Sequence, residues 1–342
     1  MTKTDDPSRS PQADSARHWV QVLARYRDPS HVRSITEIAI TAAPFIALVV
    51  AAVWALSVSQ ALAAAISLVN GAFLIRLFII QHDCGHSTLF RNRKVNDWIG
   101  RVLGVFTMTP YDVWRRTHAI HHSGSGNLDR RGIGDLPTLT VEEYRALPRG
   151  RRFFYRLYRH PLFLFGLTPT YVFLLQYRLP IGLMRAGGRY WVSAMATNLV
   201  LGGLLGVGVW FLGAPAIFCV FLPTALVAAT TGMWMFYVQH QFEDTRWDHE
   251  DDWQVHDAAL HGSSHYVLPP VLRWFTGNIG IHHVHHLYAR IPFYRLTEVL
   301  RDHPILDKAQ RLTLRESLVC ARLHLWDEKQ RRLLSFREAR LA

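Results

Sequence analysis

The sequence predicts an all-α integral membrane protein in which four transmembrane helices form two hairpins and a cytoplasmic helical cap holds a histidine-rich site for two metal ions. Three observations lead to this fold class. Two long stretches of the 342 residues are almost free of charge, the basic residues lie outside them, and about half of the 19 histidines are clustered. An apolar content of 49% excludes a disordered chain, and three cysteines are too few for a disulfide-stapled secreted scaffold.

The first apolar stretch predicts two helices that cross a membrane, near residues 38–57 and 61–80. Arg76 is the one charged residue between Ile38 and Ile80, and a short uncharged linker separates the two halves. A helix of about 20 apolar residues crosses a hydrocarbon layer of roughly 30 Å. The alternative is a pair of buried helices in a large soluble core.

The second apolar stretch predicts another hairpin, with spans near 191–212 and 216–238. No Asp, Glu, Lys or Arg occurs between Trp191 and Gln241. Two such uncharged runs favour membrane helices over a soluble core, because lipid admits few charges and requires helices that satisfy their own backbone.

Basic residues orient these hairpins. The chain carries a net charge of +12, and its lysines and arginines gather before, between and after the hairpins. The positive-inside rule therefore places both termini and the central segment in the cytoplasm. We expect a cytoplasmic N-terminal segment at 1–35, a membrane domain at 36–302 and a basic cytoplasmic C-terminal segment at 303–342. The positive net charge is then explained by the orientation of the chain in the membrane and by attraction to lipid headgroups, and no nucleic-acid partner is expected.

Histidines form three clusters on the expected cytoplasmic side. They are His82 and His86, then His118, His121 and His122, and last His282, His283, His285 and His286; His240 ends the fourth span. Residues at i, i+3 and i+4 share one face of a helix, so each HxxHH sequence is expected to direct three imidazoles the same way. Imidazoles bind zinc, copper, iron and nickel, and zinc is saturated by four ligands. Nine candidate imidazoles therefore indicate two metal ions.

Other residues near the clusters have more modest expected roles. His283 and His265 are candidates for hydrogen bonds that orient the ligands. Cys84 is expected to pack as a small apolar residue. The histidines that occur singly are expected to play no part in the site: His18, His31, His160, His249, His256, His303 and His324.

The sequences HDCGH, HAIHH and HHVHH, at these separations and after these spans, resemble the histidine boxes of the membrane fatty acid desaturase family. The resemblance extends from about Val53 to Asp302 and is greatest to bacterial and cyanobacterial acyl-lipid desaturases of the omega-6 (delta-12) type. It implies two non-haem iron ions, dioxygen as co-substrate, a membrane lipid or acyl substrate, and an electron donor that is a ferredoxin or a b-type cytochrome. A bacterial inner membrane is the implied location.

The resemblance also implies residue roles. The iron ligands would be His82, His86, His118, His121, His122, His282, His285 and His286, with His240 as a ninth by its position after the fourth span. In related acyl-CoA desaturases an asparagine holds a metal-bound water, and Asn278 is the candidate here, although it sits elsewhere in the chain. Carboxylates that could balance the charge of the ions are Asp83, Asp112, Asp129 and Asp135.

The chemistry of an alkyl chain agrees with this resemblance. An unactivated methylene pair has no accessible acidity, so removing hydrogen from it requires an oxidant made from dioxygen, and iron changes redox state where zinc does not. Alkane or carotenoid hydroxylases and ketolases of the same histidine-box class remain an alternative, and a bis-histidine haem electron carrier is a more distant one.

An apolar tunnel would admit such a substrate. Residues 160–177 are expected to form an interfacial or re-entrant helix beside its mouth, because they are too short an apolar run to cross the membrane. Aromatic residues at 111, 114 and 153–155 are expected at the level of the lipid headgroups.

Overall fold

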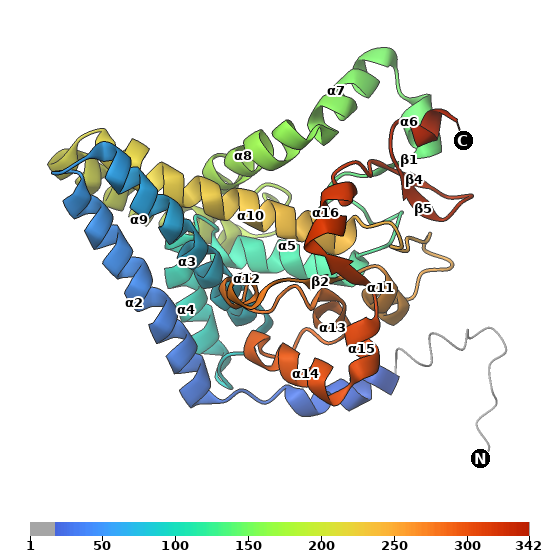
Figure 1. Cartoon of the computed structure of the whole chain (residues 1–342), viewed down its shortest axis with the longest axis horizontal. Helices are drawn as coiled ribbons and strands as arrows, with labels where there is room; N and C mark the ends of the chain where they lie inside the picture. Colours follow the sequence, from blue (N-terminus) through green and yellow to red (C-terminus); the bar gives the residue numbers. More distant parts are fainter. Residues whose placement is uncertain (1–17, 342) are drawn as a thin grey trace.

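Four long helices dominate the computed structural model, which describes residues 18–341 (Figure 1). They are α2 (His31–Ala55), α3 (Gln60–His86), α9 (Gly188–Leu212) and α10 (Leu222–His240), with a π-helical segment, η4 (Ala216–Phe221), leading into α10. All four are long and apolar enough to cross a membrane. Short connections join α2 to α3 and α9 to η4, so the predicted pair of hairpins is confirmed.

The helices extend beyond the predicted spans at their polar ends. α2 begins at His31 because the Ser30 side chain accepts a hydrogen bond from the backbone N–H of Arg33 at 3.3 Å. α3 continues past residue 80 to His86, and its last turns contain buried polar residues such as Gln81 and Asp83. Hydropathy marks only the apolar part of a helix, whereas its backbone hydrogen bonds continue wherever the protein itself surrounds the polar side chains.

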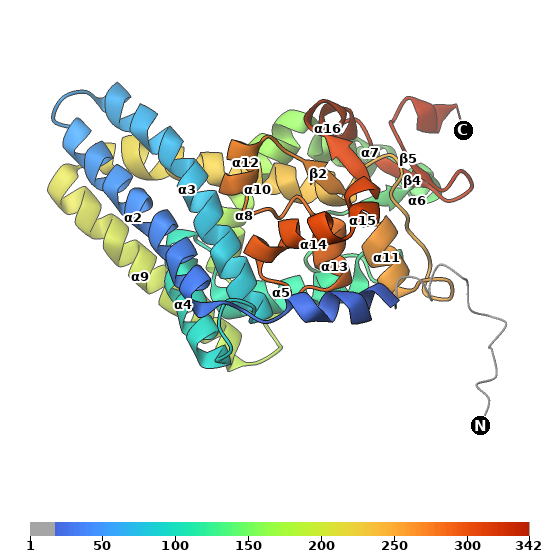
Figure 2. The ribbon, with the colours of Figure 1, turned by 60° about the horizontal axis from the view of Figure 1, so that its bottom comes forward.

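Short helices build the cap, which lies at the other end of the molecule from the hairpin tips (Figure 2). They are α4 (Arg93–Phe106), α5 (Tyr111–Gly124), α6 (Val141–Ala146), α7 (Arg149–Arg159), α8 (Thr168–Leu174), α11 (Val255–His261), α12 (Pro270–Phe275), α13 (His282–Leu287), α14 (Leu296–Asp302), α15 (Pro304–Lys308) and α16 (Leu314–Cys320). The cap also contains short strands, which the all-α prediction did not include. A three-stranded sheet has the order β1 (Leu139–Thr140), β4 (Leu325–Asp327), β5 (Arg332–Leu334), and β2 (His265–Val267) pairs in parallel with β3 (Arg311–Thr313).

The C-terminal segment packs onto the membrane helices through a buried arginine. The Arg159 guanidinium donates to the carbonyl of Leu323 at 2.9 Å and to the hydroxyl of Tyr237, on α10, at 3.1 Å. The Tyr237 hydroxyl in turn donates to the same carbonyl at 2.6 Å. These bonds join residues from α7, α10 and the chain after α16.

Residues 160–177 are largely helical, which agrees with the helix expected there. A π-helical turn, η2 (Phe163–Leu167), leads into α8, and a 3-10 turn, η3 (Gln176–Arg178), follows. Tyr111 and Trp114 were expected at the headgroup level, and the structure corrects this: both are buried inside the protein. They lie on the inward face of α5, where helical packing outweighs their amphipathic character.

A buried ion pair joins the first hairpin to the cap. Arg76 on α3 contacts the Glu37 carboxylate on α2 and the backbone carbonyl of Trp274 on α12, and its guanidinium lies 3.9 Å from the Trp274 ring centroid. Its Nε also donates to the Thr41 hydroxyl at 3.1 Å. The one charged side chain in the first apolar stretch is thus paired and faces the protein interior, because an unpaired charge that faced lipid would be costly.

Breaking this ion pair is expected to destabilise the fold. Arg76→Met removes the buried partner of the Glu37 carboxylate and leaves it paired with the largely exposed Arg33. This change costs about 3 kcal/mol, so the unfolding midpoint in detergent should fall by roughly 5 °C or more. Arg33→Met is the matched control, because Arg33 also pairs with Glu37 but its side chain is 58% exposed. A double Glu37→Met, Arg76→Met variant should recover much of the loss, and equal midpoints for wild type and Arg76→Met would refute this assignment.

Candidate metal centre

Histidines from four helices meet where α3 and α10 end. The last two turns of α3 carry His82 and His86, α10 ends at His240, and α5 and α13 supply the rest. The ring nitrogens form two groups, and within each group they lie within 4.8 Å of one another. The five-histidine group is His82, His86, His118, His122 and His285, and the four-histidine group is His121, His240, His282 and His286.

In the five-histidine group the Nε2 atoms face one another. Nε2 of His118 lies 3.0 Å from Nε2 of both His86 and His122, and Nε2 of His285 lies 3.1 Å from that of His122. Nε2 of His82 is buried and has no hydrogen-bonding partner among the described residues. Buried ring nitrogens in this arrangement are costly unless a cation binds them.

The four-histidine group has the same character and lies beside the first. Nε2 of His240 is 3.1 Å from Nε2 of both His121 and His282, and Nε2 of His286 is buried with no partner in the part of the chain that is described. The rings of His286 and His122, one from each group, stack with centroids 4.1 Å apart. The geometry therefore provides two adjacent metal sites.

Each HxxHH sequence supplies both groups, which corrects the expectation that its three imidazoles point the same way. On α5, His118 and His122 belong to the five-histidine group and His121 to the other. On α13 the assignment is reversed, with His285 alone in the five-histidine group. Residues i and i+4 are about 40° apart around a helix, whereas consecutive residues are about 100° apart, so the i+3 imidazole diverges from its i+4 neighbour.

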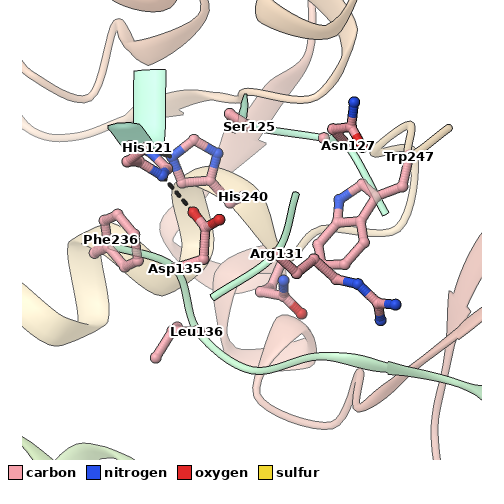
Figure 3. Close-up of a pocket in the computed structure, with 11 residues that line it drawn as sticks. His121, Ser125, Asn127, Arg131, Asp135, Leu136, Phe236, His240 and Trp247 are labelled. Atoms are coloured by element: carbon pink, nitrogen blue, oxygen red, sulfur yellow. Dashed lines mark hydrogen bonds and ion pairs between the residues drawn. The ribbon is translucent and has the colours of Figure 1, made fainter. Parts of the chain in front are cut away.

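Hydrogen bonds at Nδ1 fix two of these rings. Nδ1 of His121 lies 2.5 Å from a carboxylate oxygen of Asp135 (Figure 3). Nδ1 of His240 lies 3.3 Å from the carbonyl oxygen of Gly262. Both acceptors hold the ring proton on Nδ1, so both Nε2 atoms present lone pairs to each other across 3.1 Å. Two lone pairs at this distance repel unless a cation lies beside both, so the residues present fit a bound metal ion.

Burial keeps most of the histidines that α5 and α13 contribute to the site uncharged. Desolvation first, and then the neighbouring imidazoles, lower the pKa of His118, His122 and His285 well below the ordinary value for histidine. The same causes lower the pKa of His282 and His286. Neutral imidazole is the form that binds metals, so these residues are available as ligands at neutral pH.

Asp83 and Asn278 both hold the backbone of Phe293. One Asp83 oxygen lies 3.1 Å from Nδ1 of His82, and the other accepts the Phe293 N–H at 2.7 Å. The Asn278 amide donates to the Phe293 carbonyl at 3.2 Å. Asp83 therefore contacts a histidine of the site, as expected for a supporting residue, whereas the Asn278 amide contacts a backbone carbonyl.

His283 and His265 support α13 from outside the site. Nε2 of His283 donates to the Leu306 carbonyl at 2.9 Å, and Nδ1 of His265 donates to the Asp307 carbonyl at 3.0 Å. Their ring centroids lie 5.6 Å apart. Neither residue offers a nitrogen to the two groups, and the same holds for the histidines that occur singly.

Two aromatic residues contact histidines of the site, and these contacts were not predicted from the sequence. Trp114 stacks on His118 with centroids 4.6 Å apart, and Phe236 packs against His121 at 5.0 Å and His240 at 5.3 Å. Each aromatic residue lies four positions before a histidine of its own helix, and this spacing was the available signal.

Of the four carboxylates proposed for charge balance, two lie at the site and two lie elsewhere. Asp83 and Asp135 contact histidines of the site, as described above. Asp112 pairs with Arg101 at 3.0 Å, and Asp129 pairs with His249 at 2.9 Å. Asp129 and Asp135 both lie in the loop that follows α5. Sequence spacing alone therefore does not tell which of the two reaches His121.

A large apolar cavity of about 710 Å³ reaches the histidines. His82, His118 and His282 contribute to its wall, and the rest is lined mainly by apolar residues of α3, α5, α8 and α10 with no lysine or arginine. α8 and the residues around it form part of this wall, in line with the expectation of a helix beside a tunnel. A far smaller pocket touches His121 and His240 and includes Asp135 and Arg131 (Figure 3).

Metal content should follow the two histidine groups. We expect about two metal ions per purified chain and no Soret band, since haem needs two axial ligands per group rather than four or five imidazoles. His121→Ala and His285→Ala, one from each group, should each lower the content to about one ion. His249→Ala is the control, because His249 is exposed and outside both groups. Equal losses in all three variants, measured by elemental analysis, would contradict the two-site geometry.

The carboxylate of Asp135 should strengthen metal binding at the four-histidine group. Asp135→Asn removes the charge that holds the His121 proton on Nδ1, and such changes weaken metal binding by about 10- to 100-fold. Titration with a chelator measures the loss. Asp129→Asn alters a comparable His–Asp pair at the surface and should bind as tightly as wild type; if it weakens binding as much, the effect is not local.

Comparison with known proteins agrees with this geometry. A fatty acid desaturase family model matches residues 59–316. A protein named fatty acid desaturase from Bacillus subtilis is 38% identical over 325 residues, which is 95% of this chain and 92% of that protein.

Two relatives from Synechocystis are each 26% identical. An sn-1 acyl-lipid omega-3 desaturase (ferredoxin) matches over 71% of this chain and 68% of its own length. An sn-1 oleoyl-lipid 12-desaturase matches over 66% of this chain and 64% of its own length. Two histidine groups that could each hold a metal ion lie beside the ends of two of the four apolar helices. Together with these matches over most of the chain, they show that the protein is a membrane protein of the fatty acid desaturase family.

Proposed function

We propose that this protein is a membrane-bound diiron desaturase that introduces a cis double bond into the acyl chain of a membrane lipid. The observation that carries the proposal is the position of two all-histidine groups, each able to hold a metal ion, beside the wall of a large apolar cavity. The nine histidines are the proposed ligands, and Asp83, His265 and His283 are proposed as supporting residues. Asn278 is proposed to brace the backbone beside the site.

Iron is the proposed metal because the reaction is a redox reaction. The alkyl chain loses two hydrogens, and together with two electrons from a donor and two protons they reduce dioxygen to two waters. When bound, two iron ions would supply the dioxygen chemistry that imidazole, indole and carboxylate side chains cannot perform.

The chain's own residues would hold and shield the substrate. A mainly apolar cavity wall suits an acyl chain, and because the wall has no lysine or arginine it offers no cation to an anionic carrier of the acyl group. Trp114, stacked on His118, presents a flat apolar surface next to a ligand of the five-histidine group. These contacts would orient a methylene pair toward the ligands and exclude water.

The finer features of the proposal come from the relatives and from charge. Two relatives are named as ferredoxin-dependent, which supports a ferredoxin as the electron donor, with a b-type cytochrome as the alternative. The basic segments support a cytoplasmic position for both termini and the histidines, in a bacterial inner membrane. The histidine-box resemblance supports the delta-12 (omega-6) position, although relatives named for position 12 and for omega-3 are equally similar.

Hydroxylation or ketolation of an alkane or carotenoid is the second candidate function. The same ligand set could serve either outcome, because the metal site determines the oxidant more than the product. The family match and the acyl-lipid relatives favour desaturation.

Expression in a bacterial host with monounsaturated membrane lipids tests the proposal. Gas chromatography with mass spectrometry of the lipids should show new double bonds, with a diunsaturated 18-carbon chain if the position is delta-12. His285→Ala should abolish the product while the chain still inserts in the membrane, and His249→Ala should retain it. Hydroxylated chains alone would favour the alternative, and product from His285→Ala would refute the diiron assignment.

A further inference from the structure

α3 and α10 touch closely at one point inside the membrane region. A Cβ atom on Gly71 would lie 2.6 Å from the Val227 Cβ and 3.1 Å from the Thr224 carbonyl oxygen, so only glycine allows this approach. Leu74 and Ala228, next along the two helices, line the apolar cavity. The contact therefore closes the cavity at the end far from the histidines.

From this contact the two helices form the walls of a wedge that ends at the metal ligands. Leu74, Phe78 and His82 follow one another at i+4 spacing on α3 and all line the cavity. On α10, Ala228, Gly232 and Phe236 do the same, and the next position in the series is His240. A single column of side chains on α10 thus leads from the closed end to a ligand.

Gly232 marks an open position in this column. No atom lies within 4 Å of the place where its Cβ would be, and the residue lines the cavity. A larger side chain there would enter the cavity without striking the protein. Helix rise places Gly232 about 12 Å and Ala228 about 18 Å from His240 along the axis.

These distances convert to a number of carbons. An extended alkyl chain advances about 1.25 Å per carbon, from a bond of about 1.5 Å and tetrahedral angles. The column of side chains on α10 therefore matches the length of about ten carbons from His240 to Gly232, and of roughly fourteen from His240 to Ala228. Because the closed end has no lysine or arginine, the methyl end of an acyl chain fits there and a polar head group does not.

We propose that Gly232 and Ala228 on α10 determine how many carbons lie between the new double bond and the methyl end of the substrate. The inference rests on the proposed desaturase function but not on the delta-12 position. A double bond at position 12 of an 18-carbon chain leaves five carbons beyond it, which fill only half of the wedge up to Gly232. The depth of the wedge favours a double bond farther from the methyl end.

Substitutions of Gly232 and Ala228 test whether these residues determine the number of carbons beyond the double bond. Wild type, Gly232→Ala, Gly232→Leu and Ala228→Leu are expressed in a host supplied with 14-, 16- and 18-carbon fatty acids, and mass spectrometry locates each double bond. Gly232→Leu should reduce the number of carbons beyond the double bond, and Gly232→Ala should do so less. Each excluded methylene should disfavour the longer products by a factor of about four. Ala228→Leu, deeper in the wedge, should affect only the longest chains.

Gly206→Leu is the matched control, since Gly206 lies on α9, outside the cavity lining, and also has no atom within 4 Å of its Cβ position. Its products should equal those of wild type. The proposal is wrong if Gly232→Leu leaves the distribution of double-bond positions unchanged, or if it lowers all products equally while the metal content stays normal. Failure of the desaturase proposal is a different result, because wild type itself would then form no double bond.

Discussion

Nine buried or half-buried imidazoles bring their ring nitrogens together in two groups, an arrangement that is costly without cations, and much of the fold serves to hold them there. Where acceptors fix the proton on Nδ1, as for His121 and His240, the facing lone pairs repel until a metal ion is shared. A metal ion tolerates little displacement of its ligands, so four helices must end at defined positions. Binding of the ions is therefore coupled to assembly of the cap on the membrane helices.

The residues that orient the ligands come from segments distant in the chain. Asp135 lies in the loop after α5, Gly262 follows α11, and Phe293, which holds Asp83, lies beyond α13. The Glu37–Arg76 pair and its contact with Trp274 connect the same parts of the molecule from the membrane side. A change in any of these contacts would shift a helix end relative to its neighbours and so weaken the metal sites without touching a ligand.

The apolar cavity and the ligand groups share two helices, and this has a consequence for specificity. α3 and α10 carry His82 and His240 at one end and cross at Gly71 and Val227 farther along. The distance from the histidine groups to the closed end is therefore a property of two rigid helices rather than of flexible loops. Substitutions in the wall can change the depth available to a substrate while the ligands stay in place.

Local patterns in the sequence determined the membrane class, the four spans and the nine histidines, because apolar run length and i, i+4 spacing act within one helix. Only the tertiary structure decided how the histidines divide into groups of five and four, because that depends on where the i+3 imidazoles of α5 and α13 point relative to other helices. The choice of Asp135 over Asp129, the stacking of Trp114 on a ligand and the closure of the cavity at Gly71 are equally nonlocal. Each of these contacts depends on which surfaces of distant segments meet, and this cannot be predicted from the spacing of residues in the sequence.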